Sequence, residues 1–349
     1  MSFFANIYNK KVEIFIMSNI YPLKPKSVLI IGLGQLGLPV AKYVKSKGFD
    51  VYGYDIREGA MIVANQIHGI KLSNSFKNFD IYIVCISTHD RDNIHLPQVD
   101  DLLSIVKKIS YEASDGALIS IESTIPAGTC RKIFDLLEHR IHLVHAPHRW
   151  YSLDEEKHGV NQLRVIGGVN SCCLKIGLNF YCGENNFSYV EKSPDLNSLT
   201  FIDESNKSNL ESVQYTIDET KSKNSMNSLG IKMHPVSSIE LAELTKIIEN
   251  SHRYLQIAFA EELYLYCQAN NIPFSELRDA LNTKWNVDIL EPRDGIDGHC
   301  LPKDTKMFIA SSQKIKSKIL QSAMEIDSAY REYRELRSKK VVNPITNIS

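Results

Sequence analysis

The sequence predicts an α/β protein in which an N-terminal, doubly wound parallel sheet is followed by an all-helical central domain. The chain has 349 residues, more than one hydrophobic core usually holds, so two domains are expected. Short runs of β-branched residues alternate with amphipathic helical patterns through the first half, which is typical of βαβ units. A long helical pattern begins near Ser238, and only helical patterns follow it.

The composition excludes several classes of function. A hydrophobic fraction of 43% and a charged fraction of 23% are those of an ordinary globular protein. The net charge of −1 gives no basic surface for nucleic acid or an anionic membrane, and no apolar run approaches the ~18 residues of a membrane span. The 7 cysteines are scattered and odd in number, which favours reduced thiols in the cytoplasm.

Residues 1–24 are predicted to be a disordered extension. Lys10, Lys11 and Glu13 interrupt its apolar residues, so it does not have the pattern of a signal peptide. Met17 is a plausible alternative to Met1 as the start of translation.

Residues 27–31 form a short apolar run that predicts a buried parallel strand. The motif G-x-G-x-x-G follows at 32–37 and opens an amphipathic helix that ends near Lys47, where Gly48 stops it. A second strand, 51–54, leads directly into Asp55. Strand, glycine turn, helix, strand and acid in this order predict a Rossmann-type dinucleotide site.

Each residue of this pattern has an expected role. Gly32 permits the tight turn, Gly34 lets the backbone approach a pyrophosphate, and Gly37 brings the helix against the sheet. Asp55 would accept hydrogen bonds from the adenosine ribose, which favours NAD over NADP, although Arg57 is close enough to keep NADP open. The predicted cofactor site comprises Gly32, Gly34, Gln35, Leu36, Gly37, Asp55, Ile56, Arg57, Ser87, Thr88 and Thr124.

Further β/α alternation predicts strands at 80–87 and 117–123 with a helix at 100–111 between them. Thr124 directly follows the second of these strands. The carboxyl ends of parallel strands are where doubly wound sheets bind ligands, so Thr124 is expected to contact cofactor or substrate. A helix N-cap and turn is the alternative interpretation of this segment.

Residues 142–147 predict another strand, with histidines at 142, 145 and 148. Side chains at 142 and 145 of a strand point to opposite faces of the sheet. We therefore expect no metal site from these histidines.

The first domain is predicted to span 25–236 and to bind NAD. Within it, residues 184–227 are rich in Ser, Asn, Asp, Glu and Lys, which predicts a flexible surface insertion. A last strand is expected at 230–234. The helical central domain, which also serves dimerisation, is predicted at 237–340, with a frayed tail at 341–349.

A capping box at Ser237–Ser238–Ile239–Glu240 predicts the start of a helix that runs to about Asn270. Its apolar stripe predicts burial between domains or at a dimer interface. The stripe consists of Leu241, Leu244, Ile248, Leu255 and Phe259, flanked by Ile247, Tyr254 and Ala258. Lys246 and Asn250 share another face, where they could hold an oxyanion, or form an exposed polar stripe.

The segment 291–305 reads E-P-R-D-G-I-D-G-H-C-L-P-K-D-T, between predicted helices at 273–281 and 303–312; a last helix is predicted at 317–339. A helix that begins after Pro302 would place Cys300 near its amino end, where the helix dipole lowers the pKa of a thiol. Cys300 is then a candidate nucleophile, and Asp304 could order a water beside it. The alternative is a buried, structural cysteine.

Together these motifs resemble the UDP-glucose/GDP-mannose dehydrogenase family, and especially its UDP-N-acetylmannosamine (UDP-ManNAc) 6-dehydrogenases. The similarity covers about residues 27–335 in the order of the family. The resemblance begins with the glycine motif and Asp55. The other matching segments are E-S-T-I-P-A-G-T at 122–129, R-V-I-G-G-V at 164–169, A-E-L-T-K-I-I-E-N at 242–250 and D-G-I-D-G-H-C-L-P-K-D at 294–304.

The resemblance implies that a sugar primary alcohol is oxidised to a uronic acid in two NAD-dependent steps. Cys300 would be the nucleophile, forming first a thiohemiacetal and then a thioester. Lys246 and Asn250 would stabilise the oxyanions, and Asp304 with Thr124 would position the hydrolytic water. The resemblance also implies a UDP-sugar substrate and a homodimer formed through the helix from Ser238.

This sequence departs from the family pattern in three ways. His148 stands where the family has a Glu, and could serve as a base with a pKa near 6.5 unless its surroundings shift that value. Asp297 replaces a glycine, which would narrow the pocket and raise the pKa of the neighbouring thiol. The chain ends where the family's C-terminal UDP-binding domain would begin, so we expect weak binding of UDP-sugars unless another polypeptide supplies that domain.

Two other functions remain open. A catalytically impaired, NAD-binding paralogue is consistent with these departures. An enzyme similar to the β-hydroxyacid dehydrogenases would also have a catalytic Lys and Asn, but a single oxidation needs neither Cys300 nor Asp304.

Overall fold

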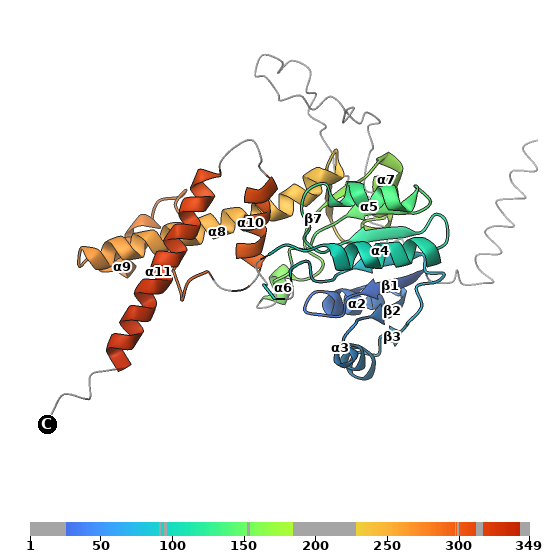
Figure 1. Ribbon diagram of the computed structural model, residues 1–349, viewed down its shortest axis with the longest axis horizontal. Helices are drawn as coiled ribbons and strands as arrows, with labels where there is room; N and C mark the ends of the chain where they lie inside the picture. Colours follow the sequence, from blue (N-terminus) through green and yellow to red (C-terminus); the bar gives the residue numbers. More distant parts are fainter. Residues whose placement is uncertain are drawn as a thin grey trace, which may run out of the picture.

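The computed structural model describes residues 26–90, 92–93, 96–151, 154–183, 228–296, 298, 300–311 and 317–342. The predicted extension, the insertion at 184–227, most of the tail and Asp297 lie outside the described residues. The described chain forms an eight-stranded α/β sheet, from one side of which a group of helices extends (Figure 1). The predicted fold class is confirmed.

The sheet has the strand order β3-β2-β1-β4-β5-β6-β7-β8. The strands are β1 (Ser27–Ile31), β2 (Asp50–Tyr54), β3 (Lys71–Leu72), β4 (Ile81–Val84), β5 (Leu118–Ile121), β6 (His142–His145), β7 (Arg164–Gly168) and β8 (Met233–Pro235). Neighbouring strands are parallel except β6 and β7, which are antiparallel. The strand order reverses between β1 and β4, and doubly wound sheets bind ligands at such a point.

The helices of the α/β part are α2 (Gly37–Ser46), α3 (Glu58–Ile62), the π-helix η1 (Val63–Ile67), α4 (Asp100–Glu112), α5 (Thr129–Leu137), α6 (Glu155–His158) and α7 (Ser171–Tyr181). The helical region consists of α8 (Ile239–Ala269), α9 (Phe274–Leu281), α10 (Cys300–Ser311) and α11 (Lys318–Val342).

The sheet is buried on both faces, which is why its strands read as continuous apolar runs. Along β1, Val28 and Ile30 point into one hydrophobic layer and Leu29 and Ile31 into the other. Helices α2 and α7 cover the first layer, and α4 and α5 cover the second. The sheet is therefore a rigid platform for the loops at its edges.

Several element boundaries differ from the prediction. Helix α10 begins at Cys300 itself, not after Pro302. The cap of α8 is Ser238, whose hydroxyl accepts a hydrogen bond from the Leu241 N–H, not Ser237. Strand β8 covers only the last part of the predicted strand 230–234. The sequence patterns predict none of the elements β3, β7, α3, η1, α5, α6 and α7.

The buried side of α8 is rotated from the predicted stripe. Ile247, Tyr254 and Ala258, expected at its flank, are buried, and the latter two pack with residues of the α9–α11 part of the chain. Leu241, Ile248 and Phe259 are 44%, 42% and 53% exposed in the single chain. A single chain therefore buries the flanking residues of the stripe and leaves these three stripe residues exposed.

Candidate active site

The glycine turn after β1 has no room for side chains at two of its positions. A Cβ on Gly32, whose φ is +91°, would lie 2.5 Å from the carbonyl oxygen of Cys85. A Cβ on Gly37 would lie 1.7 Å from the carbonyl oxygen of Gly32, so α2 starts directly against the strand. Residues 34–36 lead directly into α2, whose first N–H groups belong to Gly37 and Leu38, and a helix N-terminus of this kind attracts phosphate.

Asp55 lies at the carboxyl end of β2, as predicted, and is 6% exposed. Its Oδ2 accepts hydrogen bonds from the Leu33 N–H (2.7 Å) and Arg57 Nη2 (3.2 Å), and its Oδ1 from the Arg57 N–H (2.8 Å) and Nε (3.1 Å). Burial raises the pKa of Asp55, but these contacts outweigh it and the net shift is downward. The carboxylate stays charged and is occupied by Arg57, which is mostly exposed.

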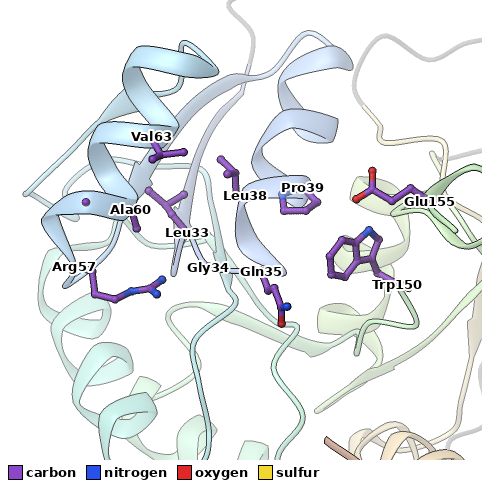
Figure 2. Close-up of a pocket in the computed structure, with 11 residues that line it drawn as sticks. Leu33, Gly34, Gln35, Leu38, Pro39, Arg57, Ala60, Val63, Trp150 and Glu155 are labelled. Carbon is purple, nitrogen blue, oxygen red and sulfur yellow. The ribbon is translucent and has the colours of Figure 1, made fainter. Parts of the chain in front are cut away.

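A cavity of about 500 Å³ adjoins this turn (Figure 2). It is lined by Leu33, Gly34, Gln35, Leu38, Pro39, Arg57, Gly59, Ala60, Val63, Trp150 and Glu155. Figure 2 shows the Arg57 guanidinium extending towards Gly34, with Trp150 and Glu155 beyond Gln35 on the other side. The cavity lies beside Arg57, and Cys300 is not among its lining residues. The turn, the helix N-terminus and Asp55 together fit a dinucleotide such as NAD.

The predicted residues after β4 and β5 meet each other. The Thr88 hydroxyl donates to the carbonyl oxygen of Thr124 at 2.6 Å. The Ser87 hydroxyl lies 2.7 Å from Nδ1 of His89, away from that contact. Lys303 of α10 donates from Nζ to the Thr88 hydroxyl at 3.2 Å. Lys303, 4% exposed, therefore joins the helical region to the end of the sheet where the strand order reverses.

Lys246, Asn250, Cys300 and Asp304 come together between α8 and α10. Asn250 donates from Nδ2 to Asp304 Oδ2 at 2.5 Å, and Lys303 Nζ lies 3.1 Å from Asp304 Oδ1. Burial lowers the pKa of Lys246, partly offset by the charges of Asp304, Glu249 and Cys300 nearby. Asp304 is 1% exposed, so its carboxylate is held by an amide and an ammonium group inside the protein.

Cys300 is the first residue of α10, and its side chain is exposed. We expected a lowered pKa from the helix dipole, but the pKa of this thiol is raised. Partial desolvation is the main cause and the charge of Asp304 the second, and these outweigh the opposite effects of Lys303 and Lys246. The thiol needs a base, or the approach of a cation, before it acts as a nucleophile.

His148 lies in a buried cluster around Glu122, and the two side chains are in contact. Arg164 Nη1 lies 3.2 Å from Glu122 Oε1, and the Tyr181 hydroxyl donates to the same oxygen. Burial lowers the pKa of His148 to about 4, aided by Arg164 and Lys246, so its surroundings move it well below the reference value near 6.5. The interior of the protein penalises the charged imidazolium more than Glu122 stabilises it.

Two contacts that the sequence had not indicated, one buried and one half-buried, fix α8 against the α/β part of the chain. Glu243, fully buried on α8, accepts hydrogen bonds from the N–H groups of Gly128 and Cys130 at the start of α5. Glu249 forms an ion pair with Arg149 in the loop after β6. Glu243 and Lys303 both lie within the motifs that carry the family resemblance. Those motifs are the sequence feature from which these two residues could have been identified.

The described chain combines a doubly wound sheet, with a glycine turn that fits a dinucleotide, and a helical region that follows it. The sequence model of the NAD-binding domain of the UDP-glucose/GDP-mannose dehydrogenase family matches residues 61–183, and that of the family's central domain matches residues 240–329. The chain belongs to the UDP-glucose/GDP-mannose dehydrogenase family.

Similar proteins include UDP-N-acetyl-D-mannosamine dehydrogenases. That of Methanococcus maripaludis is 26% identical over 330 residues, which cover 88% of this chain and 66% of that protein. That of Campylobacter jejuni is 25% identical over 352 residues, covering 91% and 75%. The chain thus spans about two thirds of the length of the first of these relatives.

Solved structures share the fold. The UDP-D-ManNAc dehydrogenase of Pyrococcus horikoshii superimposes with a TM-score of 0.67 at 23% identity, covering 88% of this chain and 69% of that one. A 3-hydroxyisobutyrate dehydrogenase of Mycobacterium tuberculosis superimposes with a TM-score of 0.58 at 13% identity, covering 88% of this chain and 94% of that one.

Among the helices that the structure describes, none is long and apolar enough to cross a bilayer.

Proposed function

We propose that this chain oxidises the primary alcohol of a nucleotide sugar, of the UDP-N-acetylmannosamine or UDP-glucose type, to a uronic acid with NAD. The observation that carries the proposal is the grouping of Lys246, Asn250, Cys300 and Asp304 beside the loop of Thr88 and Thr124. The glycine turn and Asp55 supply the cofactor site. NAD bound there would take up one hydride in each of the two oxidation steps.

Cys300 is the residue that makes a four-electron oxidation possible. Its sulfur adds to the aldehyde carbon after the first oxidation, and the carbonyl oxygen becomes the hydroxyl of a thiohemiacetal. The second oxidation converts this adduct into a thioester. Water then attacks the thioester carbonyl, and the carbon–sulfur bond breaks to release the carboxylate and the Cys300 thiol.

Lys246 and Asn250 stabilise the negative oxygen in these steps. Lys246 carries an ammonium group in a largely desolvated position, where its charge acts strongly on a neighbouring oxyanion. Asn250 uses one N–H on Asp304 and has a second amide hydrogen to offer the substrate. The same bond fixes the orientation of the Asn250 amide.

Asp304 is the proposed base for the thiol and for the hydrolytic water, with Thr124 as its partner in placing that water. It lies close enough to Cys300 to affect the pKa of the thiol, and its carboxyl group is held in place by contacts with Lys303 and Asn250. His148 is neutral near pH 7 and packed against Glu122, so we assign it the positioning of Glu122 and not proton transfer.

We further propose that two copies pair through α8. The exposed apolar residues Leu241, Ile248, Phe259 and Tyr266 follow one another at intervals of 7, 11 and 7 residues, which keeps them on one face of the helix. This face would give the homodimer its contact.

The proposal is tested by incubating the chain with NAD and a panel of UDP-sugars and identifying the products by mass spectrometry. We expect a uronic acid from one sugar, with two NADH formed per molecule. The Cys300→Ala variant should still bind NAD but form no carboxylate, since no thioester can form. Complete four-electron turnover by this variant would refute the thiol mechanism.

Two further outcomes would favour the other functions. NAD binding without turnover of any nucleotide sugar, even by the wild-type chain, would indicate an impaired paralogue. Oxidation of a β-hydroxyacid, included in the same panel, with turnover that does not depend on Cys300 would indicate an enzyme of the hydroxyacid type.

A further inference from the structure

A second group of reactive side chains lies at the start of β6, outside the candidate active site. It consists of His139, His142, Cys172 and Cys173, and one ligand atom from each lies within 4.8 Å of all the others. The Cys172 sulfur is 3.3 Å from His139 Nε2 and 3.8 Å from His142 Nδ1. The Cys173 sulfur is 3.7 Å from the same His142 nitrogen.

The antiparallel strand β7 brings these residues together. Because β7 runs against β6, it ends beside the start of that strand, where the Val169 N–H donates to the carbonyl oxygen of Leu143. Asn170 then caps α7 by accepting a hydrogen bond from the Cys173 N–H, which directs the first turn of α7 towards His142. The active-site loops follow the carboxyl ends of β4 and β5, whereas the cluster lies at the amino end of the parallel strand β6. The two sites are therefore at opposite ends of the strands.

The spacing fits a tetrahedral metal centre. With Zn–S near 2.3 Å and Zn–N near 2.05 Å, a tetrahedral angle puts sulfur and nitrogen about 3.6 Å apart. The three sulfur–nitrogen distances lie between 3.3 and 3.8 Å. We propose that His139 Nε2, His142 Nδ1, Cys172 Sγ and Cys173 Sγ bind one Zn²⁺. Two thiolates and two neutral imidazoles balance the charge of this ion, and tetrahedral S₂N₂ sites select zinc.

The four ligands differ in burial, so a bound ion would be enclosed by protein on one side and accessible to solvent on the other. Cys173 is buried and His142 half-buried, whereas His139 and Cys172 are exposed and face solvent. Asn170 is hydrogen-bonded to both exposed ligands, donating to His139 Nε2 at 3.2 Å and accepting from the Cys172 thiol at 3.0 Å. Zinc would replace both contacts, with loss of the thiol protons to solvent.

The backbone before β6 already directs His139 towards the cluster. Glu138 and His139 both have left-handed conformations, with φ of 50° and 56°. Such angles are unfavourable for residues with a Cβ, and Asn tolerates them best. His139→Asn is therefore the variant that removes a ligand with the least disturbance of the chain.

The test uses the full chain, purified under reducing conditions and stripped of metal with a chelator. Zn²⁺ is titrated in competition with a chromophoric chelator, and Co²⁺ is used as a spectroscopic probe of tetrahedral thiolate coordination. We expect one equivalent of Zn²⁺ per chain and a thiolate-to-cobalt charge-transfer band. His139→Asn, and Cys172→Ser combined with Cys173→Ser, should each weaken zinc binding at least about 100-fold, the upper end of the effect of losing even an outer-shell partner.

The matched control is Cys300→Ser, because Cys300 is the other exposed cysteine of the chain. This variant should bind zinc as the wild type does. Less than one equivalent in the reduced wild type, undiminished binding by the two cluster variants, or loss confined to Cys300→Ser would each overturn the proposal. Circular dichroism checks folding, and if the cysteine variant does not fold, His139→Asn alone decides.

Discussion

Asp55 and Arg57 show how a single ion pair bears on the choice of cofactor. The carboxylate accepts four hydrogen bonds, three of them from Arg57, which uses about all the lone-pair positions that a carboxylate has. Ribose hydroxyls can therefore bind Asp55 only if the Arg57 side chain turns away. Once displaced, that guanidinium is free to meet a 2′-phosphate.

We predict that the wild-type chain binds NAD at least about tenfold more tightly than NADP, a difference of about 1.4 kcal/mol. In Arg57→Ala the preference should widen, since the carboxylate is released for the ribose and the phosphate loses its cation. Calorimetric titration with both dinucleotides measures the two ratios. Arg140→Ala, which removes a surface arginine paired with Asp115, is the control.

Tighter binding of NADP than of NAD by the wild type would contradict the role of Asp55. A preference that narrows in Arg57→Ala would instead show that Arg57 helps to bind NAD, through the pyrophosphate or the adenine.

Helix α8 exposes several large apolar side chains when the chain is taken alone. The sequence predicted that the apolar stripe of this helix is buried between domains or at a dimer interface. Packing against α10 and α11 buries the side of Tyr254 and Ala258 and leaves Ile248 and Phe259 half exposed. A second copy of the helix is the partner that we propose for that surface.

The paired variant Ile248→Glu with Phe259→Glu should dissociate the proposed homodimer. Burying a large apolar side chain contributes about 1.5–3 kcal/mol, and the change affects both copies. We expect the dimer dissociation constant to rise at least about 100-fold, or 2.7 kcal/mol. Sedimentation velocity over a range of concentrations measures it.

Leu136→Glu on α5 is the matched control, because Leu136 is 48% exposed and lies at the opposite end of α5 from Gly128 and Cys130, which contact α8. A wild-type chain that is a monomer at all concentrations would contradict the proposed interface. So would a dimer that resists the paired substitution.

Elements with a strong local signal could be predicted from the sequence, and the others could not. A few neighbouring residues are enough to predict β1, β4 and β5, from their β-branched runs, and the start of α8, from its cap. Strand β7 begins with a charged residue, Arg164, and ends in two glycines, neither typical of a buried strand. Arg164 is nevertheless fully buried, because Glu122, far away in the sequence, holds it.

The candidate site shows the same limit. Cys300, Asp304, Lys246 and Asn250 could be identified through motifs. The pKa shifts of Cys300 and Lys246 could not, because desolvation depends on what packs around these two side chains. The contact of Lys303 with Thr88 joins residues 215 positions apart. Similarly, His142 was weighed only with the histidines of its own strand, whereas its neighbours on α7 come from a separate part of the chain.

At the scale of the whole molecule, two buried histidines should make stability depend on pH. Burial lowers the pKa of His145 to about 3 and that of His148 to about 4, while the unfolded chain has values near 6.5. Between these limits the unfolded state binds more protons than the folded state. The free energy of unfolding must therefore fall as the pH is lowered from about 6.5 towards 4.

We expect a loss of about 1–3 kcal/mol over this interval for each histidine, from the size of the pKa shifts. Glu122, whose pKa is lowered to about 2, adds a further loss below about pH 4.5 as the unfolded carboxyl group takes up its proton first. Urea unfolding at a series of pH values measures the slope. His148→Gln should flatten it above pH 4.5, and an equal slope in this variant would show that His148 does not cause the dependence.

The contacts that join α8 and α10 to the sheet have a consequence for any reaction at this site. Glu243, Glu249 and Lys303 each connect the helical region to a different loop, and Asn250 and Asp304 hold the two helices together. The polar groups of the proposed site are thus oriented when the chain folds, and an arriving ligand has little left to order. Preorganisation of this kind spares the ligand the entropic cost of assembling its own binding groups, so more of its binding energy can go into reaching the transition state.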